Sequence, residues 1–145
     1  MSDRPSPSRR SDYLVRYPIS TRWEDEDVYG HVNNVVYYSY FDTAVNGWLM
    51  QSSGTDIRRL PAVGLVAETG CVFHRELGFP DPVEVGIAVE RLGERSIVYR
   101  LAVFQGRSDD AAADGRFVHV YVDRDSREVV DVPAQIRATL AALQP

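Results

Sequence analysis

The residues best placed for chemistry lie in one acidic segment, TRWEDEDVYGHVNN, at residues 21–34. Asn33 and Asn34 suit the start of a helix, because a short amide side chain accepts hydrogen bonds from the free N–H groups of a first turn. The positive end of a helix dipole also attracts an anion or a polarised carbonyl. Asp27 taken alone, three residues before Gly30, is more typical of an Asx turn or a solvated loop acid.

The apolar run after this segment predicts one long buried helix that reaches Met50. Apolar residues recur at every fourth position in two neighbouring rows: Val36, Tyr40, Ala44 and Trp48, and beside them Tyr37, Phe41, Val45 and Leu49. Two adjacent rows make a wide buried stripe, which favours a helix wrapped by a sheet over a helix on a surface.

The rest of the chain predicts strands joined by short connections. Alternating or apolar runs place them at about residues 13–19, 64–77, 83–89, 97–104 and 117–122. Pro18 indicates an edge or a bend in the first strand, and Gly70 a bulge or a close backbone approach in the second. A short extension at residues 129–130 precedes a C-terminal helix that Pro133 begins. Short connections favour antiparallel neighbours, so the order predicts a sheet curled around one helix.

Length and composition indicate a single domain. The chain has 145 residues, enough to bury a core without disulfides or metal. Residues 1–11 are rich in Ser, Pro and Arg and predict a disordered tail, which leaves residues 12–145 as the domain. The single cysteine, Cys71, lies in an apolar run and is expected to be a buried thiol.

Charge and hydropathy exclude several classes of partner. A net charge of -5 argues against nucleic acid or an anionic membrane as the main partner, because phosphate binding relies on clustered Lys and Arg. No apolar segment is long enough to cross a bilayer, and the N-terminus lacks the hydrophobic centre of a secretory signal. We therefore expect a cytoplasmic protein.

The segment from Asp25 to Phe41, D-x-D-V-Y-G-H-V-N-N-V-V-Y-Y-x-Y-F, resembles hotdog-fold thioesterases of the 4-hydroxybenzoyl-CoA type. The strand order and the LGERS turn agree with that family from about Tyr13 to beyond Phe117. The resemblance implies an α+β hotdog fold, with an antiparallel sheet of five to six strands curled around one central helix. It also implies a homodimer with acyl-CoA sites where two protomers meet, a frequent further pairing into a homotetramer, and no cofactor or metal.

The resemblance gives Asp27 and Asn34 catalytic roles. Asp27 matches the family's catalytic carboxylate, and the Asn34 backbone N–H at the helix start would polarise the thioester carbonyl and stabilise oxyanion charge. Asp27 then either attacks the carbonyl carbon or deprotonates a water, and both routes need only a carboxylate near the carbonyl. The complete pattern outweighs the simpler interpretation of Asp27 as a turn residue.

Five further residues are predicted to contact or shape the substrate site. Gly30 supplies a backbone conformation or a close approach that a side chain would block. His31 either hydrogen-bonds the substrate or ties down the loop. Asn33 is interpreted as a cap or loop brace, while Tyr37 lines the acyl pocket or belongs to the core. Ser96, after the LGE turn, is a candidate for the opposite wall.

Other active-site patterns are absent from the sequence. His31, His74 and His119 show no metal-ligand spacing, and there is no G-x-S-x-G elbow, P-loop or dinucleotide fingerprint. Glu24 and Asp25 are expected to be solvated or structural.

Two alternatives keep the same fold. One is a thioesterase that acts on thioesters of acyl carrier protein, because the helix end contacts the thioester group and not the carrier to which it is attached. The other is a non-catalytic acyl-CoA-binding protein. A hotdog hydratase fits less well, since those enzymes resemble D-x-N-x-x-H and this loop reads D-V-Y-G-H. The arginines that would bind CoA stay unassigned among Arg75, Arg91, Arg95 and Arg116.

Overall fold

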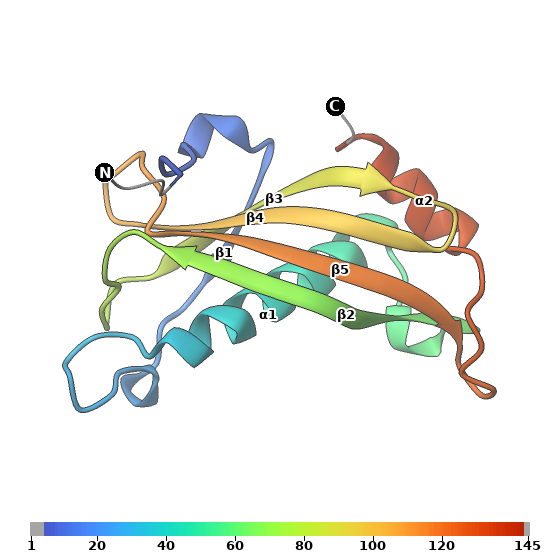
Figure 1. The fold of residues 1–145 in the computed structure, drawn as a ribbon, viewed down its shortest axis with the longest axis horizontal. Coiled ribbons are helices and arrows are strands. Elements are labelled where there is room, and N and C mark those ends of the chain that lie inside the picture. Colours follow the sequence, from blue (N-terminus) through green and yellow to red (C-terminus); the bar gives the residue numbers. More distant parts are fainter. Residues whose placement is uncertain (1–4, 144–145) are drawn as a thin grey trace.

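The computed structural model describes residues 5–143, which form a five-stranded antiparallel sheet with the long helix along one of its faces (Figure 1). In chain order the elements are η1 (Arg10–Asp12), β1 (Val15–Ile19), η2 (Trp23–Asp25), α1 (Asn34–Ser53), η3 (Ile57–Arg59), β2 (Ala62–Phe73), β3 (Val83–Leu92), β4 (Ser96–Gln105), β5 (Ala113–Asp123) and α2 (Ala134–Ala141). The strands lie in the order β1-β3-β4-β5-β2, and the sheet curves around α1 without closing. The predicted α+β hotdog fold is confirmed.

The two apolar rows of the sequence hold α1 against the sheet. One row is buried along its whole length: Tyr37, Phe41, Val45 and Leu49. The row beside it is buried at Tyr40 and Ala44 and half-buried at its two ends, Val36 and Trp48. The helix continues three residues past the predicted end, to Ser53. There Gly54 adopts a left-handed φ of 67° and donates its N–H to Met50 O at 3.1 Å, a conformation that glycine tolerates best.

The two edge strands, β1 and β2, confirm the prediction made from Pro18 and contradict the one made from Gly70. Pro18 lies in β1, an edge strand as predicted, where its missing N–H removes no bond from a second neighbour. Neither alternative predicted for Gly70 holds: it pairs regularly with Arg116, so it is no bulge, and a Cβ there would meet nothing within 4 Å, so there is no close backbone approach. The register between β2 and β5 shifts between Val66 and Glu68, which makes Ala67 the extra residue.

The end of the chain is partly as predicted. Val129 forms an isolated bridge with Val122, which confirms the short extension before the C-terminal helix. α2 then begins at Ala134, with Pro133 as the residue before its first turn. Ile136 and Leu140 are buried in the same core as α1. None of the helices within residues 5–143 is both long and apolar enough to cross a membrane.

Residues 8–11, assigned from the sequence to the disordered tail, make specific contacts. Ser8 donates from its backbone N to Asp114 Oδ2 at 3.1 Å and from its hydroxyl to Asp114 Oδ1. Arg10 forms an ion pair with Glu84 on β3. The partners are polar and distant in sequence, so apolar patterning gives no sign of them. Residues 1–4 of the expected tail lie outside the described residues.

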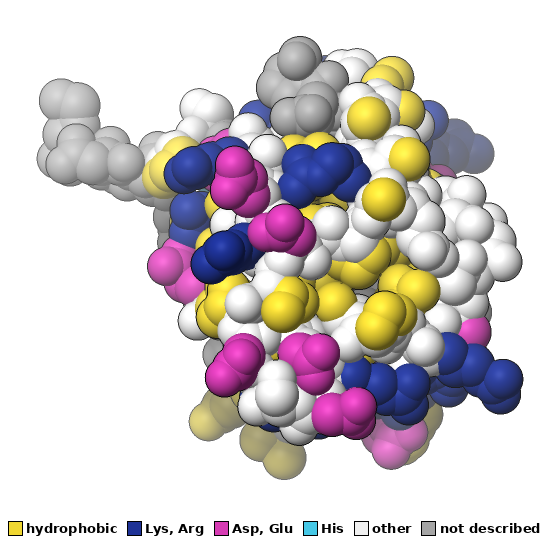
Figure 2. Space-filling view, turned by 90° about the vertical axis from the view of Figure 1, so that its right-hand side faces the viewer, with side chains coloured by type: hydrophobic (Ala, Val, Ile, Leu, Met, Phe, Trp, Pro, Cys, Tyr) yellow, Lys and Arg dark blue, Asp and Glu magenta, His cyan; other side chains and the backbone are white. Residues whose placement is uncertain are grey.

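The end of the molecule at which α1 and β3 finish exposes a band of apolar side chains (Figure 2). Arginine and acidic side chains lie around this band on the same face.

We predict that Gly115→Ala destabilises the protein and that Gly70→Ala does not. A Cβ at Gly115 would overlap the buried ring of Phe41, standing 2.6 Å from its Cζ, and overpacking of this kind costs about 1–3 kcal/mol. Gly70 pairs with the adjacent Arg116 and has open space at its Cβ position, which makes it a matched control. Urea unfolding midpoints measure both variants, and equal midpoints would contradict this packing of α1 on β5.

Candidate active site

The acidic loop is anchored by a buried carboxylate, Asp25. It is 1 % exposed and accepts hydrogen bonds from the Tyr40 hydroxyl at 2.7 Å and the Arg22 backbone N at 2.8 Å. Burial opposes its ionisation, but these hydrogen bonds and the Arg22 guanidinium outweigh that effect and lower the pKa of Asp25. Of its two expected roles the structural one holds, because Asp25 fastens the loop to the buried face of α1.

Asp27 lies at the surface of the same loop, where two donors fix its carboxylate. The Tyr29 backbone N donates to Oδ1 at 2.9 Å and Asn33 Nδ2 donates to Oδ2 at 2.9 Å. The hydrogen bonds from Tyr29 and Asn33 favour the charged form and lower the pKa of Asp27. The carboxylate is therefore ionised and oriented at neutral pH.

Gly30 provides the bend that turns the loop back toward the helix. Its φ is +86°, and its N–H donates to Asp27 O at 3.1 Å, while Asp27 N donates to His31 O at 3.1 Å. A Cβ at Gly30 would meet nothing within 4 Å. Of the two predicted roles, glycine is thus needed for backbone conformation and not for a close approach.

The helix begins next to this carboxylate. Asn33 is the N-cap of α1 and its Oδ1 accepts from Val35 N at 3.0 Å, which confirms the predicted cap. Asn34 is the first helical residue, so its N–H has no intrahelical acceptor, and no other acceptor for it occurs within residues 5–143. An unsatisfied donor at the positive helix end is thus available to a ligand.

A pocket of about 420 Å³ lies between the loop, the helix start and the end of β2. Of the residues predicted from the sequence, it is lined by Asp27, His31, Asn33, Asn34 and Tyr37. His31 directs Nδ1 toward Val32 O at 3.2 Å and Nε2 toward Glu76 Oε1 at 3.8 Å. The buried Tyr37 belongs to both the core and the pocket wall.

Ser96 is not brought to this pocket. It begins β4 beside the turn, where its carbonyl accepts from Gly93 N at 2.9 Å, and it pairs across the sheet with Val120. Phe73, which does line the pocket, belongs to the opposite end of the sheet through its pairing with Ala113. Within one protomer Ser96 and Asp27 therefore lie at different ends.

Comparison with known proteins places this geometry in a family. Residues 21–140 match the model of the thioesterase-like superfamily. The chain belongs to that superfamily. The match covers both the loop that carries Asp27 and the end of β2 that lines the pocket. No curated protein matches the sequence.

Solved structures share the fold over nearly the whole chain. The PA5185 protein from Pseudomonas aeruginosa is 48 % identical, with 97 % of each chain covered and a TM-score of 0.92. Two more distant structures bear the names of thioesterases. The gentisyl-coenzyme A thioesterase BH1999 is 21 % identical, covering 87 % of this chain and 99 % of its own, with a TM-score of 0.77. The 1,4-dihydroxy-2-naphthoyl-CoA thioesterase Slr0204 from Synechocystis is 14 % identical over 88 % and 96 %, with a TM-score of 0.80.

This thioesterase-like site contains residues that the sequence did not identify. Phe73, His74 and Glu76 line the pocket from the end of β2, together with Arg75, which was one of the four arginines considered for CoA. His74 is held by Asp114 on β5, which lies 2.8 Å from its Nε2. The polar run HRE directly after an apolar strand is the one local signal, and the position of that strand end beside the loop depends on the tertiary fold.

Cys71 is half-buried, not fully buried as expected, and it is not an activated nucleophile. Burial, reinforced by the nearby Asp114 carboxylate, raises the pKa of the Cys71 thiol to about 12. The side chain therefore stays a neutral thiol at physiological pH, as its apolar context predicts.

We predict that Asn33→Ser raises the pKa of Asp27 while it preserves the helix start. Serine keeps an oxygen that caps the first turn but loses the amide that donates to Asp27 Oδ2. Because that hydrogen bond favours the charged form, its loss lets Asp27 take up a proton at a higher pH. Carboxyl carbon NMR titration measures the change, and Asn46→Ser in α1 serves as a control far from the loop. An unchanged Asp27 titration would contradict the hydrogen bond.

Proposed function

We propose that this chain is a thioesterase of the 4-hydroxybenzoyl-CoA type that hydrolyses an acyl-CoA thioester to a free acid and CoA. The observation that carries the proposal is the shared pocket of Asp27 and Asn34: Asp27 brings an ionised carboxylate to its lining, and Asn34 is the first residue of α1, whose N–H has no intrahelical acceptor. The superfamily match supports thioester hydrolysis, and BH1999 gives an example of this fold in a CoA thioesterase.

The chemistry follows from these two groups. The thioester oxygen accepts a hydrogen bond from the Asn34 N–H, and the helix end stabilises the negative charge that develops on that oxygen. By one route Asp27 attacks the carbonyl carbon, CoA leaves as thiolate, and water hydrolyses the mixed anhydride. By the other, Asp27 takes a proton from a water that attacks directly. Both routes need the ionised carboxylate that Tyr29 and Asn33 maintain.

Arg75 is the best candidate to bind the phosphates of CoA. It lines the same pocket as Asp27, whereas Arg116 forms ion pairs with Glu68 and Glu90 on the sheet. A guanidinium at the pocket mouth suits a phosphate through bidentate hydrogen bonds. Free CoA should therefore compete with the substrate, and a lack of competition would favour an acyl-carrier-protein thioesterase.

The free edge of β2 supports the proposed homodimer. This strand has 12 residues and exposes Leu65, Val66 and Val72, which are 46 %, 45 % and 36 % exposed. Its outer N–H and C=O groups are a template for another strand. The other edge strand, β1, has five residues and contains Pro18. Antiparallel pairing of β2 with β2 of a second copy has two-fold symmetry and continues both sheets.

We predict that Asp27→Asn abolishes thioester hydrolysis. The amide neither attacks the carbonyl nor accepts a proton from water, so kcat should fall by about 10²- to 10⁴-fold. Release of free thiol from a panel of short, long and aryl acyl-CoAs measures the loss. Glu24→Gln is the matched control, because Glu24 lies in the same loop and its side chain is 71 % exposed.

Two results would contradict this assignment. Retained activity in the Asp27 variant would remove that residue from the reaction. No thiol release from any acyl-CoA by the unaltered protein would contradict the hydrolase itself, and tight acyl-CoA binding without turnover would identify the non-catalytic alternative.

A further inference from the structure

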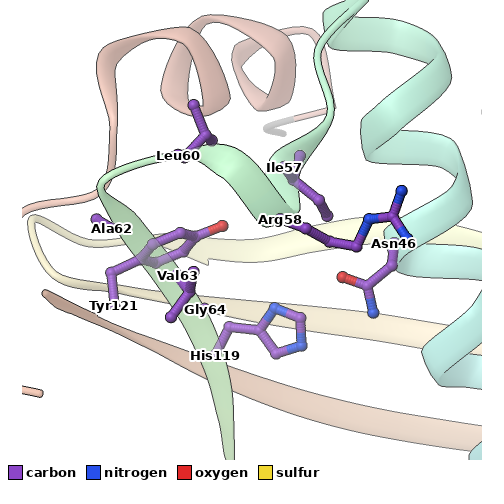
Figure 3. Close-up of a pocket in the computed structure, with 9 residues that line it drawn as sticks. All are labelled: Asn46, Ile57, Arg58, Leu60, Ala62, Val63, Gly64, His119 and Tyr121. Carbon is purple, nitrogen blue, oxygen red and sulfur yellow. The ribbon is translucent and has the colours of Figure 1, made fainter. Parts of the chain in front are cut away.

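A second cavity, of about 130 Å³, lies between the later half of α1 and the β2–β5 edge of the sheet (Figure 3). Its polar lining comes from Asn46 on α1, Arg58 on η3, and His119 and Tyr121 on β5. In Figure 3 the His119 ring reaches from β5 toward the Asn46 amide, across the gap between sheet and helix. The cavity shares no lining residue with the Asp27 pocket.

One residue of the cavity lining, His119, has a polar atom that is buried without a partner among residues 5–143. His119 is 2 % exposed, and its Nε2 has no hydrogen-bond partner within the described chain. Tyr99 does not line the cavity, but its ring centroid lies 5.3 Å from that of His119, and its fully buried hydroxyl also has no partner within the described chain. Buried polar groups in folded proteins nearly always have a partner, and an orphan costs about 1–3 kcal/mol. The cavity therefore lies next to a buried polar side chain, and it is itself lined by further polar side chains, Asn46 and Tyr121.

The two buried titratable side chains of the lining, His119 and Tyr121, are neutral at physiological pH. Burial lowers the pKa of His119 to about 4, against an opposing effect of Asp42, and burial raises the pKa of Tyr121 to about 12. Arg58, whose side chain is 78 % exposed, donates to Asp56 from Nε at 2.9 Å and from Nη2 at 3.0 Å, and Arg59 lies 3.7 Å from the same carboxylate. A carboxylate would be costly to bury here, whereas a hydroxyl or keto oxygen can hydrogen-bond to imidazole and phenol groups without a charge.

The size of the cavity limits the group that it can hold. A protein cavity of about 150 Å³ binds benzene, so this cavity accommodates about six carbon atoms. Leu60, Ala62 and Val63 give part of the lining an apolar character that suits carbon. A group that is apolar along its length and ends in one neutral oxygen matches both the volume and the polar side chains of the lining, Asn46, His119 and Tyr121.

We propose that this cavity binds the far end of the acyl group, and that it selects acyl groups of about six carbon atoms that end in a neutral hydroxyl or keto oxygen. The inference rests on the proposed thioesterase function and on the dimer through β2. Asn46 contributes as well, since its Nδ2 donates to Asp42 O at 2.9 Å and leaves Oδ1 as an acceptor.

The cavity serves the Asp27 site of a second copy and not that of its own protomer. Asn46 is 12 residues from Asn34 along α1, or about 18 Å at the rise of an α-helix, which a six-carbon group does not span. β2 carries the cavity at its Ala62–Gly64 end and the Asp27 pocket at its Phe73 end. Antiparallel pairing of two copies of β2 along their whole length brings these opposite ends together.

Three acyl-CoAs of equal length test the selectivity: hexanoyl-CoA, 6-hydroxyhexanoyl-CoA and adipoyl-CoA. We expect kcat/KM about tenfold higher for the hydroxyl end than for the methyl end, the value of roughly one neutral hydrogen bond, and lowest for the carboxylate end. Tyr121→Phe and His119→Phe should remove the preference for the hydroxyl while hexanoyl-CoA is still hydrolysed. Tyr38→Phe, which deletes a hydroxyl on α1 outside the cavity lining, should leave it unchanged.

A mixed dimer tests the arrangement across the two copies. One protomer carries Asp27→Asn and the other carries Tyr121→Phe with His119→Phe. If the cavity of one copy serves the other, one of the two sites keeps both an intact Asp27 and an intact cavity, and the hydroxyl preference returns. If each cavity serves its own protomer, no site is complete and the preference stays lost.

The outcomes separate the two levels of the proposal. Hydrolysis of hexanoyl-CoA with no preference for the hydroxyl in the unaltered protein would overturn the inference and leave the thioesterase standing, with a buried water as the partner of His119. An unchanged preference in Tyr121→Phe and His119→Phe would overturn it equally. Failure to hydrolyse any acyl-CoA would contradict the thioesterase function itself.

Discussion

The amide of Asn33 joins the two parts of the site, because its oxygen caps α1 through Val35 N while its nitrogen donates to the Asp27 carboxylate. One side chain thus fixes the start of the helix and the position of the acid with respect to it. The free Asn34 N–H follows from where the helix begins, and the ionised state of Asp27 follows in part from the same amide. Asp25 holds Asn33 in place, since its backbone carbonyl accepts a hydrogen bond from Asn33 N at 2.9 Å and its side chain accepts one from the Tyr40 hydroxyl on α1.

The fold was predictable where burial follows a period. The apolar rows of α1 indicated a helix enclosed by a sheet, and Pro18 indicated an edge strand because proline cannot donate to a second neighbour. The bulge was placed wrongly at Gly70, since a register shift depends on how two strands pair and Ala67 carries no local signal for it. The contacts of Ser8 were missed because its partner, Asp114, lies 106 residues away and the bond is polar.

The residues of the site also divide into those that the local sequence predicts and those that only the tertiary fold brings to the site. The loop residues were predictable because Asp27, Gly30 and Asn33 act within a few residues of one another, through turns and caps that depend on local sequence. His74 could not be placed at the Asp27 pocket, since the end of β2 reaches the loop only through the tertiary fold. The cavity at His119 was equally hidden. In the sequence, His119 looks like any inward-facing residue of an alternating strand. Only the packing of α1 on β5 leaves its Nε2 without a partner.

The central claim is that the Asn34 N–H binds the thioester oxygen next to Asp27. An acyl-CoA analogue with methylene in place of the thioester sulfur keeps the carbonyl and resists hydrolysis, so proton–nitrogen NMR can follow the Asn34 amide as the analogue binds. The account predicts that the Asn34 amide proton moves downfield on saturation, as it gains an acceptor, together with a downfield shift of the labelled carbonyl carbon. Saturable binding that leaves the Asn34 resonance and the carbonyl carbon unchanged would contradict it.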